Sequence, residues 1–469
     1  MQTFTKVLAP VTLVLLAGCG AVAPDALRAD VDRLVQGRLG EVAPAPAGQS
    51  QAEAVQTLLA RDVLDAPAAV RIALINSPAL QSSLATLEIS EAERVLAGVP
   101  PNPLLAVSRL REGRQLEIER LLSFNVLNLL SLPWRSRYAG QKTELAKLQA
   151  AQAVIQHAAR TRKAWINAVA AQQTANYLGE AREAAAAGAE LARRMAKVGN
   201  WSRLQQAREQ ATLADIAAQL ARARQAALSE REQLTRLMGL AGGQARYTLP
   251  ERLPDLPREL RDRPDIEAQA LRERLDVRAA KDEARYVADS LGFTRVTGAI
   301  NTLELGWRRN TTFDNAAGSR ESAGGPELEV TLPLFDWGQA RAARAEATYR
   351  QAAAKVGAVA VQARSEVRES WHGWRTSHDV ARHYRDEIVP LRKFINEETV
   401  LRYNGMLASV WELLGETRNH VAAVNNAIAA LRDFWIADTD LETALTGTSP
   451  GALAAMSAAA GPASPAQGH

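Results

Sequence analysis

Alternating apolar and polar positions predict a pair of short strands at residues 104–110 and 116–126, separated by the turn Arg111-Glu112-Gly113-Arg114. In the second strand the apolar residues share one parity, which Arg120 interrupts, and polar residues occupy the other. The apolar set is Leu116, Ile118, Leu122, Phe124 and Val126, and the polar set is Glu117, Glu119, Ser123 and Asn125. A strand with this period has one apolar and one polar face.

A second pair of strands is predicted further along the chain. Residues 293–307 are a strand candidate with imperfect alternation, a polar loop rich in Gly, Ser and Asn follows at 309–325, and residues 327–334 alternate cleanly. One face of this last segment carries Leu328, Val330, Leu332 and Leu334. Pro333 lacks a backbone N–H, so the ladder of hydrogen bonds is expected to end there.

The segments around the strands are typical of helices, some of them very long. Residues 65–96 and 263–290 each predict a leading helix. No proline occurs between 134 and 249, where strong helix formers dominate. Residues 135–198 would form a helix of about 96 Å, which a compact domain cannot hold. The chain is then predicted to break at Gly199-Asn200 and to return through residues 201–239.

The second half repeats this order of elements, which indicates a duplication. A helix over 339–403 is predicted to break at Asn404-Gly405 and to return through 409–445. Pro390 lies inside the first of these helices and should kink it. The glycines of the two breaks, Gly199 and Gly405, are 206 positions apart.

The N-terminus has the features of a bacterial secretory signal. A cationic start ends at Lys6, and the apolar run over residues 7–16 is too short to span a bilayer. Leu16-Ala17-Gly18-Cys19 resembles the bacterial lipobox, in which the cysteine is acylated, for example by palmitate, and becomes the first mature residue. Gly20 after this cysteine is typical of lipoproteins sent to the outer membrane. The alternative is an ordinary cleaved signal with an incidental cysteine.

Composition and charge argue against several classes of function. The chain has 469 residues, with 56 Lys and Arg against 52 Asp and Glu and no basic block, so we expect no nucleic-acid binding. Cys19 is the only cysteine, which excludes a disulfide within one chain. The sequence lacks a glycine-rich phosphate loop, a plausible Ser/His/Asp arrangement and a cysteine nucleophile. We therefore predict neither enzymatic activity nor a cofactor.

Three histidines lie close together in the sequence without the spacing of a metal site. His372, His378 and His383 are separated by 6 and 5 residues, which puts them on different faces of a helix. A helical metal site needs ligands at i and i+4. We interpret the three as surface residues and predict no bound metal.

The order of these motifs resembles the TolC-like outer-membrane efflux factors. The resemblance covers residues 60 to 445 and is carried by three motifs: Leu332-Pro333-Leu334-Phe335-Asp336-Trp337-Gly338, Arg263-Pro264-Asp265-Ile266 and Tyr403-Asn404-Gly405. It implies a mainly α fold with a membrane β part, in which a duplicated unit gives very long antiparallel helices that form a periplasmic α-barrel. It also implies a homotrimer in which each chain gives four strands to one shared transmembrane β-barrel.

Physical reasoning supports the shared barrel independently of the resemblance. Four strands cannot close a cylinder, and an open sheet edge in lipid leaves backbone groups unsatisfied at a cost of several kcal/mol each. Strands from several chains must therefore be combined. Two chains would supply a barrel filled by side chains, whereas three would leave a passage.

The resemblance also implies functional residues at the two ends of such a channel. Aromatic residues at or near strand ends are candidates for a membrane girdle, although ordinary capping of strand ends would explain each of them as well. They are Trp134, Phe293, Trp307, Phe335 and Trp337. At the other end, Gly199 and Gly405 would mark the tips of the helical hairpins.

The gate of the channel is expected just after Gly405. The family commonly places Asp here, but the corresponding positions hold Trp411 and Leu414, so an acidic ring is not expected. A ring drawn from Val410, Trp411, Glu412 and Leu414 could instead close the pore by apolar packing and dewetting. The alternative is that Trp411 and Leu414 merely pack their helix against its neighbour.

The predicted organisation has six parts: a signal peptide (1–18), a lipidated N-terminus and flexible lead (19–60), a first repeat (61–240), an equatorial connector (241–263), a second repeat (264–446) and a disordered tail (447–469). The expected protein is the outer-membrane exit duct of a tripartite efflux or secretion system. Its partners would be a periplasmic adaptor (membrane fusion) protein, an inner-membrane pump of the resistance-nodulation-division type and outer-membrane lipid. The alternative is a periplasmic coiled-coil structural lipoprotein without a pore. Drugs, metal ions and polypeptides all remain possible as exported substrates.

Overall fold

The computed structural model describes residues 24–39, 50–113, 115–260, 262–297, 302–314, 317–332 and 334–450. The predicted signal peptide, Cys19 and residues 451–469 of the predicted tail lie outside these segments. The chain divides into two compact units, each of which combines segments from both halves of the sequence. The strand-containing unit comprises Met1–Leu34, Leu84–Ala150 and Val277–Val359, and the helical unit comprises Val35–Ser83, Ala151–Asp276 and Ala360–His469.

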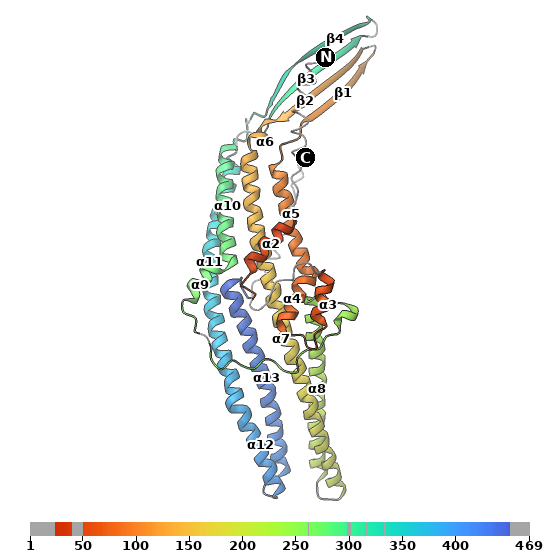
Figure 1. Cartoon of the computed structure of the whole chain (residues 1–469), viewed down its shortest axis with the longest axis vertical. Helices are drawn as coiled ribbons and strands as arrows, with labels where there is room; N and C mark the ends of the chain where they lie inside the picture. The colour runs from red at the N-terminus through yellow and green to blue at the C-terminus, as the bar shows by residue number, and fades with distance from the viewer. Residues whose placement is uncertain are drawn as a thin grey trace. The chain divides into compact units, whose positions relative to one another are not determined.

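The strand-containing unit holds a four-stranded antiparallel sheet in the order β1-β2-β3-β4 (Figure 1). The strands are β1 (Leu104–Glu112), β2 (Gln115–Asn125), β3 (Leu303–Asp314) and β4 (Ser319–Val330). Each half of the chain contributes one hairpin, and pairing of β2 with β3 joins the two. The four strands predicted for each chain are confirmed in the described segments.

The second hairpin differs from its sequence prediction at both ends. β3 begins at Leu303 and not at residue 293, because helix α10 (Leu275–Thr297) continues through residues 293–297. Most of the predicted polar loop at 309–325 is strand, since β4 already begins at Ser319. The prediction was wrong because both faces of the sheet carry polar residues here. Pairing with the neighbouring strand determines the conformation of these residues, and a pattern of alternating hydrophobic residues cannot predict such pairing.

Side-chain contacts hold the helices of the strand-containing unit together. The rings of Tyr138 and Tyr286 stack with their centroids 4.1 Å apart. Ion pairs add to this contact, from Lys147 Nζ to Asp30 Oδ2 at 2.7 Å and from Lys142 Nζ to Glu93 Oε2 at 2.5 Å. The helices involved are α2 (Pro24–Val35), α5 (Pro78–Gly98), α10 and the first part of α7 (Leu132–Lys197); the short α6 (Val126–Leu130) precedes α7.

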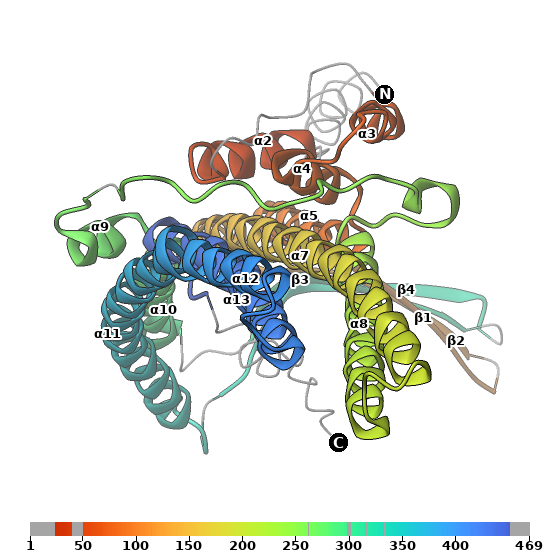
Figure 2. The ribbon, with the colours of Figure 1, turned by 90° about the horizontal axis from the view of Figure 1, so that it is seen from below.

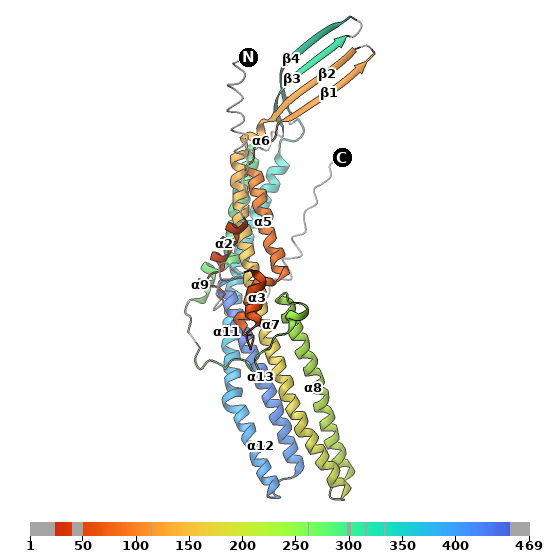
Figure 3. The same cartoon turned by 45° about the vertical axis from the view of Figure 1, so that its right-hand side comes forward.

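The helical unit is built from long helices that run in antiparallel pairs (Figure 1, Figure 3). Its long helices are the second part of α7, α8 (Arg203–Leu237), the second part of α11 (Gln339–His383), α12 (Val389–Asn404) and α13 (Val410–Thr446). Shorter elements are α3 (Gln51–Leu59), α4 (Ala66–Asn76), α9 (Ile266–Glu273) and a 3-10 turn (Gly242–Ala245). α7 alone contains 66 residues, as expected of the predicted rod.

The predicted leading helix over residues 65–96 is divided into α4 and α5 at Ser77. Ser77 has an extended backbone, with ψ of 116°, and the next residue is Pro78. A proline ring disfavours the helical conformation of the preceding residue, so the break follows directly from the sequence. Asp65 caps α4 by accepting a hydrogen bond from the backbone N–H of Ala68 at 2.7 Å.

Two apolar clusters form the interior of the helical unit. The first gathers residues of α3, α4, α7, α8 and α13 around Ile72, Val169 and Leu234, each fully buried. The second gathers α9, α11 and α13 around Phe434 and Leu441. The segment of the predicted connector contributes Tyr247, Leu249 and Leu253 to the first cluster and Leu256 to the second.

Two helical hairpins, α7/α8 and α12/α13, end in tight turns (Figure 1, Figure 2). In the first turn Gly199 has φ of +80°, and Ser202 caps α8 in a reciprocal capping box with Gln205. In the second turn the left-handed residue is Met406, with φ of +58°, and Ser409 caps α13. Gly405, the predicted tip residue, has an ordinary φ of −82°.

The hydrogen bonds show that the two turns have the same geometry with Met406 in the place of Gly199. The N–H of Gly199 reaches the carbonyl of Ala196, and that of Met406 reaches the carbonyl of Tyr403, both three residues back. The next N–H group in each turn reaches five residues back. The structural repeat is therefore 207 residues long at this point, one more than the alignment of Gly199 with Gly405 suggests.

Helix α11 passes into α12 through a π-helical turn at Tyr384–Ile388, directly before Pro390. Proline lacks an N–H and its ring crowds the carbonyl four residues earlier, so a wider turn accommodates it. None of the helices in the described segments combines the length and low charge that a bilayer-spanning helix requires.

Candidate functional site

The register of the sheet separates its residues into a polar face and an apolar face, because directly paired residues of antiparallel strands share a face. The polar face carries a network that crosses all four strands. Glu119 accepts hydrogen bonds from Ser108 Oγ at 3.0 Å and from Asn310 Nδ2 at 3.2 Å. Arg308 pairs with Glu119 at 3.3 Å and with Glu327 at 2.6 Å.

The polar face is strongly acidic. Among its described positions Arg308 is the only basic residue. Its acidic residues are Glu112, Glu117, Glu119, Glu304, Asp314, Glu321, Glu327 and Glu329. Such a face prefers contact with water and with cations.

The opposite, apolar face of the sheet is exposed to a degree that is unusual for a folded chain. Leu105, Leu328 and Trp307 keep 67%, 64% and 56% of their surface accessible. The remaining large apolar residues of this face are Val107, Leu116, Ile118, Leu122, Phe124, Leu303, Leu305, Phe313 and Val330. An extended apolar surface of this kind marks contact with a partner or a membrane.

The five girdle candidates occupy different elements. Only Trp307 lies in a strand; Trp134 lies near the start of α7, and Phe335 and Trp337 lie between β4 and α11. Trp134, Phe335 and Trp337 are exposed, the ring of Phe335 completely. Phe293 lies in α10, and its side chain is outside the described part of the structure. The girdle itself stays a prediction.

The motif around Phe335 serves to start a helix. Asp336 accepts a hydrogen bond from the backbone N–H of Gly338 at 2.8 Å and pairs with Arg341 at 3.2 Å. Gly338 has φ of +81°, a conformation that favours glycine. This local structure leaves the neighbouring aromatic side chains on the surface.

The gate candidates lie in the first turns of α13. Val410 is half-buried, and Glu412 is exposed and donates its backbone N–H to Ser409 Oγ at 3.2 Å. The side chain of Trp411 is outside the described part of the structure. Leu414 is half-buried close to Gly188 of α7, where a Cβ atom would lie 3.8 Å from Leu414 Cδ2. Within one chain this contact agrees with the packing alternative, and the gate remains a prediction.

A buried carboxylate that sequence reasoning missed lies beside this contact. Glu209 of α8 is 2% exposed, and its Oε1 atom has no hydrogen-bond partner in the described residues. Burial raises the pKa of Glu209, and the nearby Arg418 guanidinium opposes this increase. Arg418 in turn donates a hydrogen bond to Thr212 of α8, which links α13 to α8. The glutamates of α8 look alike in the sequence, so no pattern distinguishes this one.

The interpretation of all three histidines as surface residues was wrong for His378. His372 and His383 are exposed, but His378 is buried, packs edge-on against Phe434 and contacts the carbonyl of Pro257 through Nε2 at 3.0 Å. The reason is tertiary, since the connector crosses this face of α11. No group of residues suited to a metal ion occurs in the described segments.

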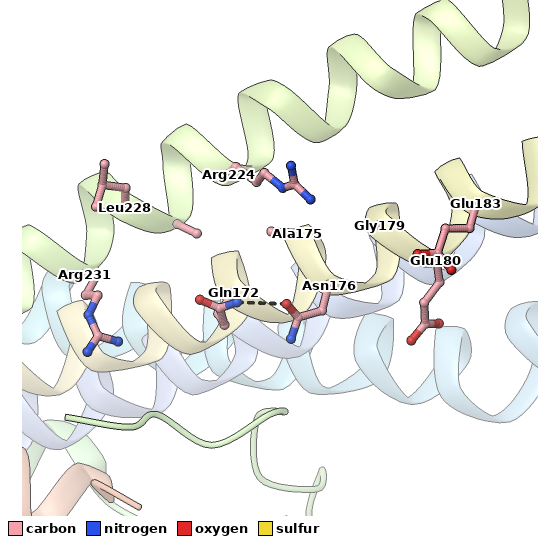
Figure 4. Close-up of a pocket in the computed structure, with 10 residues that line it drawn as sticks. Gln172, Ala175, Asn176, Gly179, Glu180, Glu183, Arg224, Leu228 and Arg231 are labelled. Carbon is pink, nitrogen blue, oxygen red and sulfur yellow. Dashed lines mark hydrogen bonds between the residues drawn. The ribbon is translucent and has the colours of Figure 1, made fainter. Parts of the chain in front are cut away.

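A shallow groove of about 480 Å³ lies between α7 and α8 (Figure 4). Gln172 and Asn176 line one side and are joined by a hydrogen bond of 2.8 Å. Glu180 and Glu183 of α7 and Arg224 and Arg231 of α8 add charged groups to its lining. The rest of the lining is small or apolar: Ala175, Gly179, Ala227 and Leu228. The groove is open and mixes charged and amide side chains with small apolar residues, so it lacks the enclosed, mainly apolar character of a small-molecule site.

No family model and no curated protein sequence matches the chain. Solved structures do. A Pseudomonas aeruginosa membrane protein is similar with a TM-score of 0.68 and 20% identity, over 82% of this chain and 94% of that one. The Campylobacter jejuni CmeC outer membrane channel is similar with a TM-score of 0.68 and 16% identity, over 87% of this chain and 91% of that one. The Vibrio cholerae outer membrane protein VceC is similar with a TM-score of 0.66 and 17% identity, over 82% of this chain and 96% of that one.

These structures are similar over nearly their whole length, and the others that match include further outer-membrane channels. The chain therefore has the TolC-like fold of outer-membrane channels, as its sequence motifs predicted.

Proposed function

We propose that this protein is an outer-membrane channel, the exit duct of a tripartite efflux or secretion system through which substrate passes passively. The observation that carries the proposal is the sheet, which has one exposed apolar face and one acidic face. Membrane barrels need this division, because one face contacts lipid and the other lines an aqueous passage. The TolC-like fold supports the same conclusion.

The channel would be a homotrimer. Within the described residues the outer strands of the sheet, β1 and β4, each have one neighbour only. Unpaired strand edges are too costly in lipid, so β1 of one chain would pair with β4 of the next. Three chains give twelve strands and leave a lumen, whereas two would give a barrel filled by side chains. Cys19 would add a lipid anchor in the outer membrane.

The helical turns would dock the periplasmic adaptor, which connects the channel to an inner-membrane pump of the resistance-nodulation-division type. Both turns expose apolar side chains: Val198 and Leu204 at 69% and 61%, and Met406 and Leu407 at 94% and 82%. Exposed apolar residues at the ends of rigid helices suit a protein partner. The identity of the exported substrate would lie with the pump.

The experiment that tests the proposal is single-channel recording of the detergent-extracted full-length protein in a planar bilayer. We expect discrete conductance steps from wild type. A Leu328→Asp variant places a charge on the apolar face and should insert poorly, whereas Glu321→Gln on the acidic face should insert normally. A folded wild-type particle that never conducts would support the structural lipoprotein without a pore.

A further inference from the structure

The apolar face of the sheet carries arginines in one half only, towards the two hairpin turns. They are Arg109, Arg111, Arg120, Arg309 and Arg320, all of them exposed. No acidic residue shares this face at its described positions. The arrangement is the reverse of the opposite face, where Arg308 stands among acidic neighbours with which it pairs.

Three of these arginines form a cluster. Arg120 of β2 and Arg309 of β3 are direct cross-strand partners, so their Cβ atoms lie about 4.5–5.5 Å apart. Arg109 of β1 pairs with Ile118 and is therefore the diagonal neighbour of Arg120. Like charges at directly opposed positions destabilise a sheet. None of the three forms an ion pair in the described segments, and all three are exposed, so the cluster can accept a negative counter-charge from a ligand.

The strand next to Arg309 leaves space for such a counter-charge. Its partner on β4 is Gly324, where a Cβ atom would lie 3.6 Å from Arg309 Cγ. A side chain at this position would cover the stem of Arg309. Glycine leaves that side of the guanidinium open to a ligand on the apolar face.

The position of the cluster along the strands matches a membrane boundary. Leu303, Leu305 and Trp307 precede Arg309 on the same face, and the strand rises about 20 Å from Leu303 to Arg309. At a tilt of about 40° this corresponds to about 15 Å along the membrane normal. Exposed Leu332 and Leu334 extend the apolar surface beyond the strand. The arginines then lie at the lipid headgroups, where exposing arginine costs only about 0–1 kcal/mol.

We propose that Arg109, Arg120 and Arg309 form a binding site for the phosphate groups of anionic lipid headgroups. The site rests on the proposed function, which puts this face in lipid and the helices in the periplasm. The hairpin turns then reach the outer leaflet, so the ligand is a phosphorylated glycolipid of that leaflet. The planar guanidinium fork binds phosphate oxygens in pairs, and each bound phosphate relieves the repulsion between Arg120 and Arg309.

The test is binding of fluorescent diphosphoryl lipid A to the detergent-solubilised full-length protein, followed by fluorescence polarisation. Arg309→Gln should weaken binding about fivefold, and the triple variant R109Q/R120Q/R309Q about a hundredfold, given about 1 kcal/mol for each basic residue near an anionic lipid surface. Arg309→Lys keeps the charge but not the planar fork, so its affinity for lipid A should lie between those of wild type and Arg309→Gln. Arg308→Gln is the matched control. Arg308 is next to Arg309 in the chain but lies on the polar face of the sheet, so this variant should bind lipid A like wild type.

Two further arms separate the possible failures. A glycolipid of the same acyl composition without phosphate should not bind, and equal binding would overturn the site. Inorganic phosphate at lipid concentrations should not displace lipid A, and displacement would overturn the assignment to lipid. The same variants are recorded in planar bilayers: if they conduct and bind lipid A like wild type, the site is wrong and the channel stands. If wild type itself does not conduct, the proposed function fails.

Discussion

The sheet and the helical unit differ in where their apolar side chains lie. In the helical unit Phe434, Leu234 and Ile72 are almost completely buried among residues of the same unit. In the sheet, Leu105 and Leu328 keep 67% and 64% of their surface accessible. Burial of apolar surface is the main source of folding free energy. The helical unit therefore supplies its own core, whereas the sheet needs an apolar phase outside the chain.

The two regions also treat their carboxylates differently. On the sheet Glu119 of β2 accepts hydrogen bonds from side chains of the two neighbouring strands, β1 and β3. In the helical unit Glu209 is buried without a partner for Oε1 in the described residues. An exposed polar face can carry many charged side chains. A buried contact between helices can carry few, because burying an unpaired charge is costly. Substitutions of buried and of exposed residues can test this difference between the two regions.

The largest difference is expected for apolar truncation. Phe434→Ala removes a ring at the centre of the second helical cluster and should lower the free energy of unfolding by about 4 kcal/mol. Leu328→Ala on the exposed face of the sheet should change it by less than about 0.5 kcal/mol. Denaturant unfolding in detergent, followed by circular dichroism at 222 nm, measures both. Equal losses would show that the sheet has a core within the chain.

A slightly smaller loss is expected when the buried arginine of the helical unit is removed. Arg274 is fully buried and binds Asp276 at 2.5 Å and Glu366 at 2.8 Å. Arg274→Met removes the buried guanidinium that both carboxylates share and should cost about 3 kcal/mol. Arg193→Met, which removes the exposed pair with Glu190, is the control and should leave the free energy of unfolding nearly unchanged. Similar melting temperatures for both variants would contradict the structural role of Arg274.

These contrasts follow largely from features that the sequence already indicates. The rod over 135–198, the break at Gly199 and the first strand pair were predicted within a few residues, because long stretches of helix formers and clean alternation are local signals. β3 and β4 were misplaced where the polar hairpin depends on pairing between strands.

Residues whose environment comes from distant segments were not predictable. His378 is buried because the connector crosses α11 at Pro257, 121 residues away in the sequence. Glu209 is buried because α7 and α13 meet α8 at that position. The tip of the second turn was assigned to Gly405 because glycine commonly ends helices, whereas the left-handed residue in the structure is Met406.

The next prediction concerns pH. Burial raises the pKa of Glu209, so the folded state holds this proton more tightly than the unfolded state. Its contribution to stability is therefore greatest below the unfolded pKa of about 4.3 and declines as pH rises through the folded pKa. Glu209→Gln should remove this decline and stabilise the protein at pH 7 by about 1 kcal/mol. Thermal melting between pH 4 and 8 compares the two, with the exposed Glu412→Gln as control. A parallel pH profile for Glu209→Gln and wild type would refute the assignment.

The smallest changes in the free energy of unfolding are expected for substitutions at the two helical turns. The two turns are similar in structure, but the corresponding substitutions should change stability in opposite directions. A left-handed conformation costs a residue with a side chain about 1–2 kcal/mol relative to glycine, partly offset by the greater freedom of glycine in the unfolded chain. Met406→Gly should therefore stabilise the protein by about 0.5–1 kcal/mol, and Gly199→Ala should destabilise it by a similar amount. No atom lies within 4 Å of a Cβ at Gly199, so only the backbone contributes there. Gly405→Ala, at φ of −82°, is the control and should be neutral or slightly stabilising. If Gly405→Ala destabilised the protein and Met406→Gly did not stabilise it, the tip of the second hairpin would lie at Gly405, and the repeat at the turns would be 206 residues.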